Sequence, residues 1–70
     1  MEKVVTVEFE DAVPEDLARI EAAEEFGTAA LRVGRYPVEA PVTFVKRDQP
    51  GRYTVLAVGE WSGDPDQKLP

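Results

Sequence analysis

The strongest constraint on the fold of this chain is a pair of β-rich runs joined by a Pro-Gly turn. The runs are residues 42–47 and 52–58, and Asp48-Gln49-Pro50-Gly51 lies between them. Proline presets φ at the first central position of a turn, and glycine accepts the positive φ that a type II turn needs next. The stretch 41–61 therefore predicts a β-hairpin. Its second run is apolar on both alternating faces, which is typical of a central strand or of one covered by another chain.

Two further strands are expected from alternating patterns. In residues 4–9, Val5, Val7 and Phe9 share one face, and β-branched residues dominate. Residues 28–33 also alternate, so a strand is predicted there, with Gly34 as a bulge or bend. Residues 36–41 contain two prolines, which favours a kinked edge segment or loop over a central strand.

One helix is predicted between the first two strands. Pro14 suits the first helical turn because its missing N–H has no partner to lose there. The helix is expected to run to about Phe26 and to stop at Gly27. Its apolar side chains recur at helical spacing, so the predicted sheet-facing stripe is Leu17, Ile20 and Ala23.

These elements predict a small α+β domain of order β-α-β-β-β. About four strands are expected to form an antiparallel or mixed sheet, with the helix on one face. The domain is predicted to span residues 1–61, followed by a disordered tail over 62–70. Phe44 is expected in the core. Because one helix covers one sheet face, we expect Val4, Leu56 and Val58 to leave an apolar patch on the other face.

The composition argues against catalysis and metal binding. The 70 residues include no cysteine and no histidine, so disulfides, the usual zinc ligands and the commonest general base are missing. The glycines form no phosphate-binding loop, and Ser62 has no histidine to activate it. Glu8, Glu10 and Asp11 are interpreted as a solvated acidic rim. The sequence predicts no catalytic residue, no cofactor and no metal.

Charge is distributed unevenly along the chain. Residues 1–27 hold nine acidic and two basic side chains, whereas residues 32–52 hold five basic and two acidic ones. The two parts either neutralise each other in the fold or present a docking surface of one sign. The net charge of −6 argues against general nucleic-acid binding. No apolar run approaches the ~20 residues of a membrane span, so we expect a soluble cytoplasmic protein without a membrane partner.

The main functional hypothesis is a small acidic protein-binding module of the regulator or inhibitor type, which is not an enzyme and forms a homodimer. A 70-residue chain without disulfides is near the size at which one core barely suffices, and oligomerisation is a common remedy. The candidate protein-binding residues are the acidic helix positions and the apolar or aromatic positions of the last strand: Glu21, Glu24, Glu25, Leu56, Val58 and Trp61.

A second hypothesis comes from a resemblance. Leu31-Arg32-Val33-Gly34-Arg35-Tyr36, followed by a hairpin that ends Tyr53-Thr54-Val55-Leu56-Ala57-Val58-Gly59, resembles the C-terminal sheet of RelE/ParE-type toxins. The resemblance implies contact with RNA or a target protein through basic side chains beside an aromatic one: Arg32, Arg35, Tyr36, Lys46 and Arg52. A third hypothesis is a scaffold shaped for folding alone, with no partner.

Overall fold

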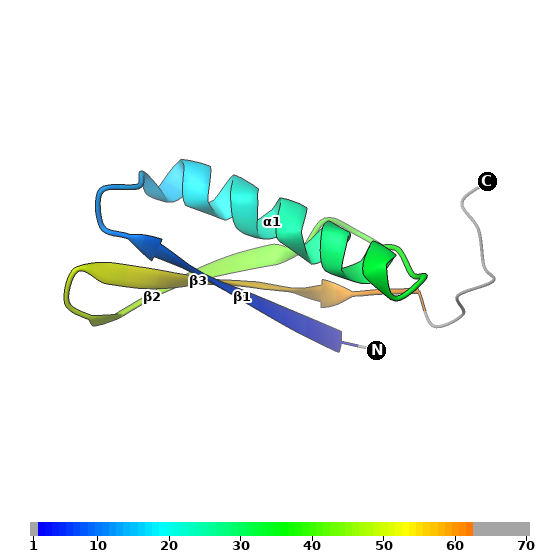
Figure 1. The fold of residues 1–70 in the computed structure, drawn as a ribbon. Coiled ribbons are helices and arrows are strands. Elements are labelled where there is room, and N and C mark those ends of the chain that lie inside the picture. Colours follow the sequence, from blue (N-terminus) through cyan, green and yellow to red (C-terminus); the bar gives the residue numbers. More distant parts are fainter. Residues whose placement is uncertain (1, 63–70) are drawn as a thin grey trace.

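The computed structural model describes residues 2–62, which form one helix and a three-stranded sheet. The elements are β1 (Glu2–Glu10), α1 (Glu15–Arg32), β2 (Val42–Gln49) and β3 (Arg52–Glu60). The sheet has the order β1-β3-β2 with antiparallel neighbours, and α1 lies over one of its faces (Figure 1). The predicted small α+β fold is confirmed, as is the central place of the hairpin's second strand.

The hairpin forms as the sequence predicts. Gln49 pairs with Arg52, and Gly51 has a φ of 81°, the positive value that a type II turn requires after proline. The register is irregular between Lys46 and Gln49, at the end of β2 just before the turn. β1 then pairs with β3 along its whole length, from Glu2 opposite Glu60 onward.

The core lies between α1 and the sheet. The helix contributes one residue per turn at a spacing of four, and β1 and β3 contribute residues from the facing side. Its buried members are Phe9, Ala18, Ala22, Phe26, Ala30, Tyr53, Val55 and Ala57. Because the buried helix stripe is mostly alanine, the helix backbone can lie close to the sheet. Among the buried helix residues, Phe26 supplies most of the side-chain volume. The Phe9 and Tyr53 rings stack with centroids 5.8 Å apart.

The predicted helix stripe is wrong. Leu17 and Ile20 are 52% and 56% exposed, and Ala23 is half-buried, so the larger apolar side chains lie outside the sheet-facing stripe. The helix turns its small side chains inward because Phe9 and Tyr53 already fill the middle of the narrow sheet. The remaining space fits alanine side chains and a closely packed helix backbone better than it fits larger side chains. Pro14 is the N-cap, one residue earlier than expected.

The strand predicted over residues 28–33 is also wrong, and with it the β-α-β-β-β order. The helix continues through Gly27 to Arg32, because Ala30 extends the buried stripe. The C-cap Val33 is followed by Gly34, whose positive φ of 73° turns the chain away from the helix. The Gly34 N–H donates to the Leu31 carbonyl at 3.1 Å, and the Arg35 N–H donates to the Ala30 carbonyl at 2.9 Å. This is the Schellman arrangement that glycine favours at a helix end.

The segment between α1 and β2 is a loop that lies against the end of β3, in agreement with the proline pattern. Pro37 forms an isolated bridge with Trp61, and the Val38 N–H donates to the Glu60 carbonyl at 2.9 Å. Ser62, expected to begin a disordered tail, is buried, and its N–H donates to the Tyr36 carbonyl at 2.8 Å. Residues 63–70 of that expected tail lie outside the described residues.

Candidate functional site

The face of the sheet opposite α1, here called the bare face, is the main candidate surface. The strand register arranges its side chains in three cross-strand rows with β3 in the middle of each. The rows are Val4–Val58–Val42, Thr6–Leu56–Phe44 and Glu8–Thr54–Lys46. Two adjacent rows therefore hold five large apolar side chains and one threonine.

Within the described residues, no helix or strand covers the bare face (Figure 1). Val4, Val42 and Phe44 are 52%, 60% and 54% exposed, and Leu56 and Val58 are half-buried. The expectation of a patch around Val4, Leu56 and Val58 is confirmed. The expectation that Phe44 belongs to the core is wrong, because its side chain leaves the face of β2 that points away from α1.

Charged residues flank the apolar rows of the bare face. Near the hairpin turn, Arg52 Nη1 contacts Glu8 Oε1 at 3.0 Å, and Lys46 Nζ lies 3.4 Å from Asp48 Oδ2. At the other end of the sheet, Glu2 is the cross-strand neighbour of Glu60. The surface thus has an apolar centre and a polar rim, the anatomy of many protein–protein interfaces.

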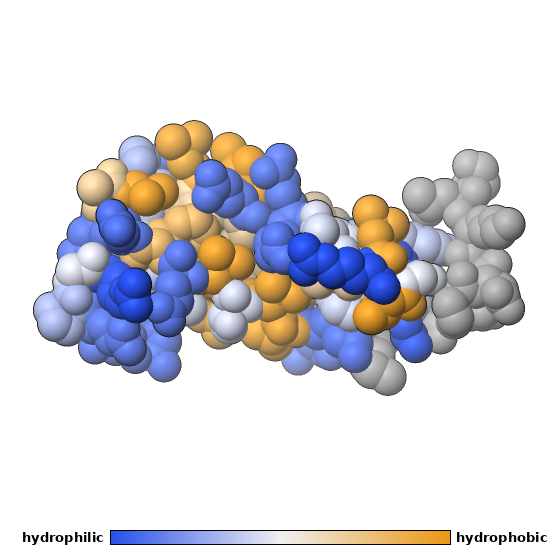
Figure 2. Space-filling model, viewed as in Figure 1, coloured by the Kyte–Doolittle hydropathy of each residue, from blue (hydrophilic) through white to orange (hydrophobic). Residues whose placement is uncertain are grey.

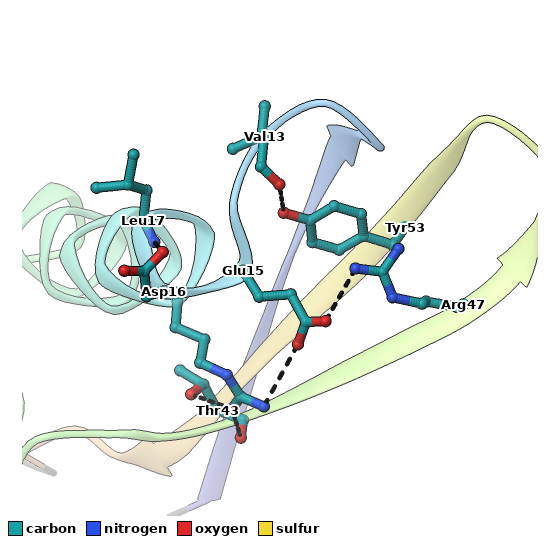
Figure 3. A network of polar contacts seen from close by, with 8 residues as sticks. Val13, Glu15, Asp16, Leu17, Thr43, Arg47 and Tyr53 are labelled. Atoms are coloured by element: carbon teal, nitrogen blue, oxygen red, sulfur yellow. Dashed lines mark hydrogen bonds and ion pairs between the residues drawn. The ribbon is translucent and has the colours of Figure 1, made fainter.

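A polar clamp, formed by Asp11, Glu15, Arg47 and Tyr53, closes the turn end of the core on the helix side. Figure 3 shows Glu15, Arg47 and Tyr53 of this clamp. Arg47 contacts Glu15 at 2.9 Å and Asp11 at 3.4 Å, and its guanidinium lies 4.3 Å from the centroid of the Tyr53 ring. The hydrogen bond to Glu15, with the charges of both carboxylates, raises the pKa of Arg47. Burial raises the pKa of the Tyr53 phenol, which donates to the Val13 carbonyl at 2.5 Å.

Ion pairs across the fold favour the neutralisation interpretation of the uneven charge. Arg47 and Arg52 come from the basic middle of the sequence, and their partners Asp11, Glu15 and Glu8 come from the acidic first third. Arg19 adds a link from α1 to β2, because its Nη1 donates to the Thr43 carbonyl at 2.8 Å. These exposed pairs orient the helix over the sheet more than they stabilise it.

The structure divides the predicted protein-binding residues among three places. Leu56 and Val58 lie on the bare face. Glu21 and Glu24 are exposed on α1, and Glu25 is paired with Arg32 at 3.2 Å. Trp61 is separate from both groups.

Trp61 lies on the helix side of the sheet. Its ring packs edge-on against Phe26 with centroids 5.8 Å apart, and the Lys3 ammonium lies 5.4 Å from its centroid. Its buried Nε1 has no hydrogen-bond partner among the residues that the structure describes. Trp61 shares this side of the sheet with Tyr53 and Val55, so it does not contribute to the bare face.

The residues predicted for RNA contact are not brought together. Arg32, Arg35 and Tyr36 lie at the end of α1, while Lys46 and Arg52 flank the hairpin turn at the opposite end of the domain (Figure 1). Four have polar partners: Arg32 with Glu25, Arg35 with the Ser62 carbonyl at 3.0 Å, Lys46 with Asp48, and Arg52 with Glu8. The resemblance to RelE/ParE-type toxins stays a prediction, and its Leu31-Arg32 segment is helical here.

The helix side carries smaller apolar features. Apolar atoms lie over the N-terminal half of α1 (Figure 2), where Leu17 and Ile20 are exposed. At the other end of α1, an open groove of about 640 Å³ lies against the loop that follows the helix. Its lining is Ala23, Glu24, Gly27, Thr28, Leu31, Tyr36 and Pro37. The groove has few polar groups to orient a ligand.

Comparison with known proteins gives no family assignment, since no family model, no curated protein and no solved structure matches the chain. Within residues 2–62, no three His, Cys, Asp or Glu side chains are grouped so that they could hold a metal ion. The described helix is not long and apolar enough to cross a membrane.

Two apolar residues of the bare face, Val42 and Phe44, were predicted neither as binding residues nor as part of the apolar patch. The signal that could have found them is the alternation of β2. Val42 and Phe44 share a face with Lys46, whereas Thr43 and Val45 share the opposite face with Arg47. The sequence alone does not say which of these faces meets the helix, because each holds apolar residues and one basic side chain.

Proposed function

We propose that the protein is a non-enzymatic protein-binding module that self-associates through the bare face. The observation that supports this proposal most directly is that five apolar side chains from three strands lie together on the bare face, and no helix or strand of residues 2–62 covers them. A sheet with an apolar face is ordinarily buried against a second layer. In a solvated antiparallel sheet, the water-facing positions are instead mainly polar.

The chemistry of the sequence supports a binding role over a catalytic one. Without histidine or cysteine, the chain lacks the side chains that most often act as general base or activated nucleophile near neutral pH. The bare face offers what an interface needs, namely an aromatic anchor in Phe44 among aliphatic neighbours and a charged rim.

The test is the molar mass in solution, measured by light scattering over a concentration series. The wild type is expected to move from monomer to dimer as concentration rises, and Phe44→Ser is expected to shift this transition to at least tenfold higher concentration. Ile20→Ser is the matched control, because Ile20 is 56% exposed on the helix side and Phe44 is 54% exposed on the bare face. A wild type that remains monomeric throughout the series would contradict the proposal.

A further inference from the structure

The bare face has a layout that specifies how two copies would meet. Resting on the proposed function, we infer that a second copy packs face to face around a two-fold axis that runs along β3, so that β1 of each copy lies over β2 of the other. Twisted sheets in aligned packing keep their strand directions within about 30° of one another, so each three-residue row faces the same row of the second copy.

Rotation about β3 places large side chains over small ones at the two edges of one apolar row. In the row Thr6–Leu56–Phe44, the small Thr6 faces the large Phe44 of the second copy, and Leu56 meets its own counterpart on the axis. In the row Val4–Val58–Val42, three valines face three valines. Alternation of large and small side chains across facing positions is what close interdigitation requires.

The same rotation makes the charged row complementary in sign. Glu8 and Lys46 flank Thr54 on opposite edges of the sheet. Glu8 of one copy therefore faces Lys46 of the second copy, and Lys46 of the first faces Glu8 of the second. The competing two-fold axis runs across the strands through the centre of the apolar rows. It stacks β1 on β1 with reversed direction and brings Glu8 over Glu2 of the second copy. The axis along β3 places Arg52 and Glu60 opposite their own counterparts at the two ends of the face, which gives one like-charge contact each. It also forms the attractive Glu8–Lys46 contact twice, whereas the competing axis forms the repulsive Glu8–Glu2 contact twice. The balance of charges therefore favours the axis along β3.

The dimensions of the face set the expected strength. Strands of nine, nine and eight residues at ~3.4 Å per residue and ~4.8 Å spacing give a face on the order of 14 by 30 Å. Two such faces in contact would bury roughly 850 Å² in total if both were flat, which approaches the low end of specific interfaces. An interface of this size belongs with weak, exchanging contacts, so a second copy is expected to associate and dissociate as concentration changes.

Thiol cross-linking tests this geometry without background, because the natural sequence contains no cysteine. Thr54→Cys and Thr6→Cys are matched variants, since both replace a threonine of the bare face by a side chain of similar size. With the axis along β3, the two copies of residue 54 face each other, as do the residues joined by the inter-sheet disulfide of immunoglobulin domains. The two copies of residue 6 then lie on opposite edges, two strand spacings apart.

At a concentration where light scattering shows the dimer, a short bis-maleimide is expected to link Thr54→Cys to itself at least tenfold faster than Thr6→Cys. A dimer in which Thr6→Cys links as fast as Thr54→Cys, or faster, would overturn the axis along β3. That outcome would leave self-association through the bare face intact. A chain that is monomeric at every concentration would remove the proposed function and this inference together, so the two failures are distinct.

Discussion

Two phenylalanines show how position in the fold decides the role of a residue. Phe26 is fully buried against Trp61 and Gly59, whereas Phe44 is 54% exposed on the bare face. Phe26→Ala is expected to lower the free energy of unfolding by about 3–5 kcal/mol. Phe44→Ala should lower it by only about 1 kcal/mol in dilute solution, because about half of the side chain already contacts water. Urea titrations at low protein concentration measure both, and equal losses would contradict the placement of Phe44.

Tyr53 gives the core a dependence on alkaline pH. Its phenol is 1% exposed, and burial raises its pKa above the ordinary value near 10 despite the nearby Arg47. Above pH 10, the unfolded chain releases this proton more readily than the folded one. The contribution of Tyr53 to stability is therefore complete below pH 10 and is lost as pH rises through the folded pKa. In Tyr36→Phe, Tyr53 is the remaining tyrosine. Its phenolate absorbance is expected to appear above pH 10, in step with loss of structure, and titration below pH 10 would contradict its burial.

At the scale of elements, two glycines are expected to respond oppositely to alanine. At Gly27 in α1, an added Cβ would meet Pro37 Cγ at 3.7 Å, an ordinary contact, so Gly27→Ala should stabilise by about 0.5–1 kcal/mol through helix propensity. At Gly59 in β3, a Cβ would lie 3.0 Å from Phe26 Cζ and 3.4 Å from Pro41 Cα. Gly59→Ala should destabilise by about 1–3 kcal/mol. Thermal midpoints that shift in the same direction would contradict this packing.

The sheet could be predicted from the sequence more fully than the helix. In β1 and β3, the period-2 pattern and the Pro50-Gly51 turn each determine local geometry, and the observed strands follow them. In α1, the choice between two apolar stripes depends on what the sheet can accommodate. Leu17 and Ile20 are more hydrophobic than Ala18 and Ala22, so the sequence favours the wrong stripe. The distance available between the helix and Tyr53 decides the choice, and that distance depends on tertiary packing, which local sequence patterns do not contain.

The same limit applies to the end of α1. Residues 28–33 alternate as a strand would, yet Ala30 also continues the stripe of Phe26 one turn later. Burial of Ala30 favours the helix, and Gly34, rather than Gly27, provides the stop. The candidate surface was predicted in part for a related reason. Alternation in β3 identifies Leu56 and Val58, but the assignment of Phe44 to a face requires knowing on which side the helix lies.

At the scale of the whole molecule, one helix on a three-stranded sheet leaves the domain with a thin core. Its helix side is closed by Phe26, Trp61 and the polar clamp, while on its other side no helix or strand of residues 2–62 covers the two apolar rows. A chain of 70 residues without disulfides has little stability in reserve, so a second layer over the bare face would add a substantial share. Association and folding stability should then be linked.

That linkage predicts a thermal midpoint that depends on protein concentration. If only folded chains dimerise, mass action stabilises the folded state more as the protein concentration rises above the dissociation constant. The gain is about 2.7 kcal/mol at a hundredfold excess of concentration over the dissociation constant. For a domain of this size, ~1 kcal/mol corresponds to about 4–8 °C, so calorimetry over a hundredfold concentration range should show a rise of several degrees. Phe44→Ser should abolish the rise while Ile20→Ser retains it. A midpoint independent of concentration in the wild type would mean that the sheet and its single helix are stable without a second layer.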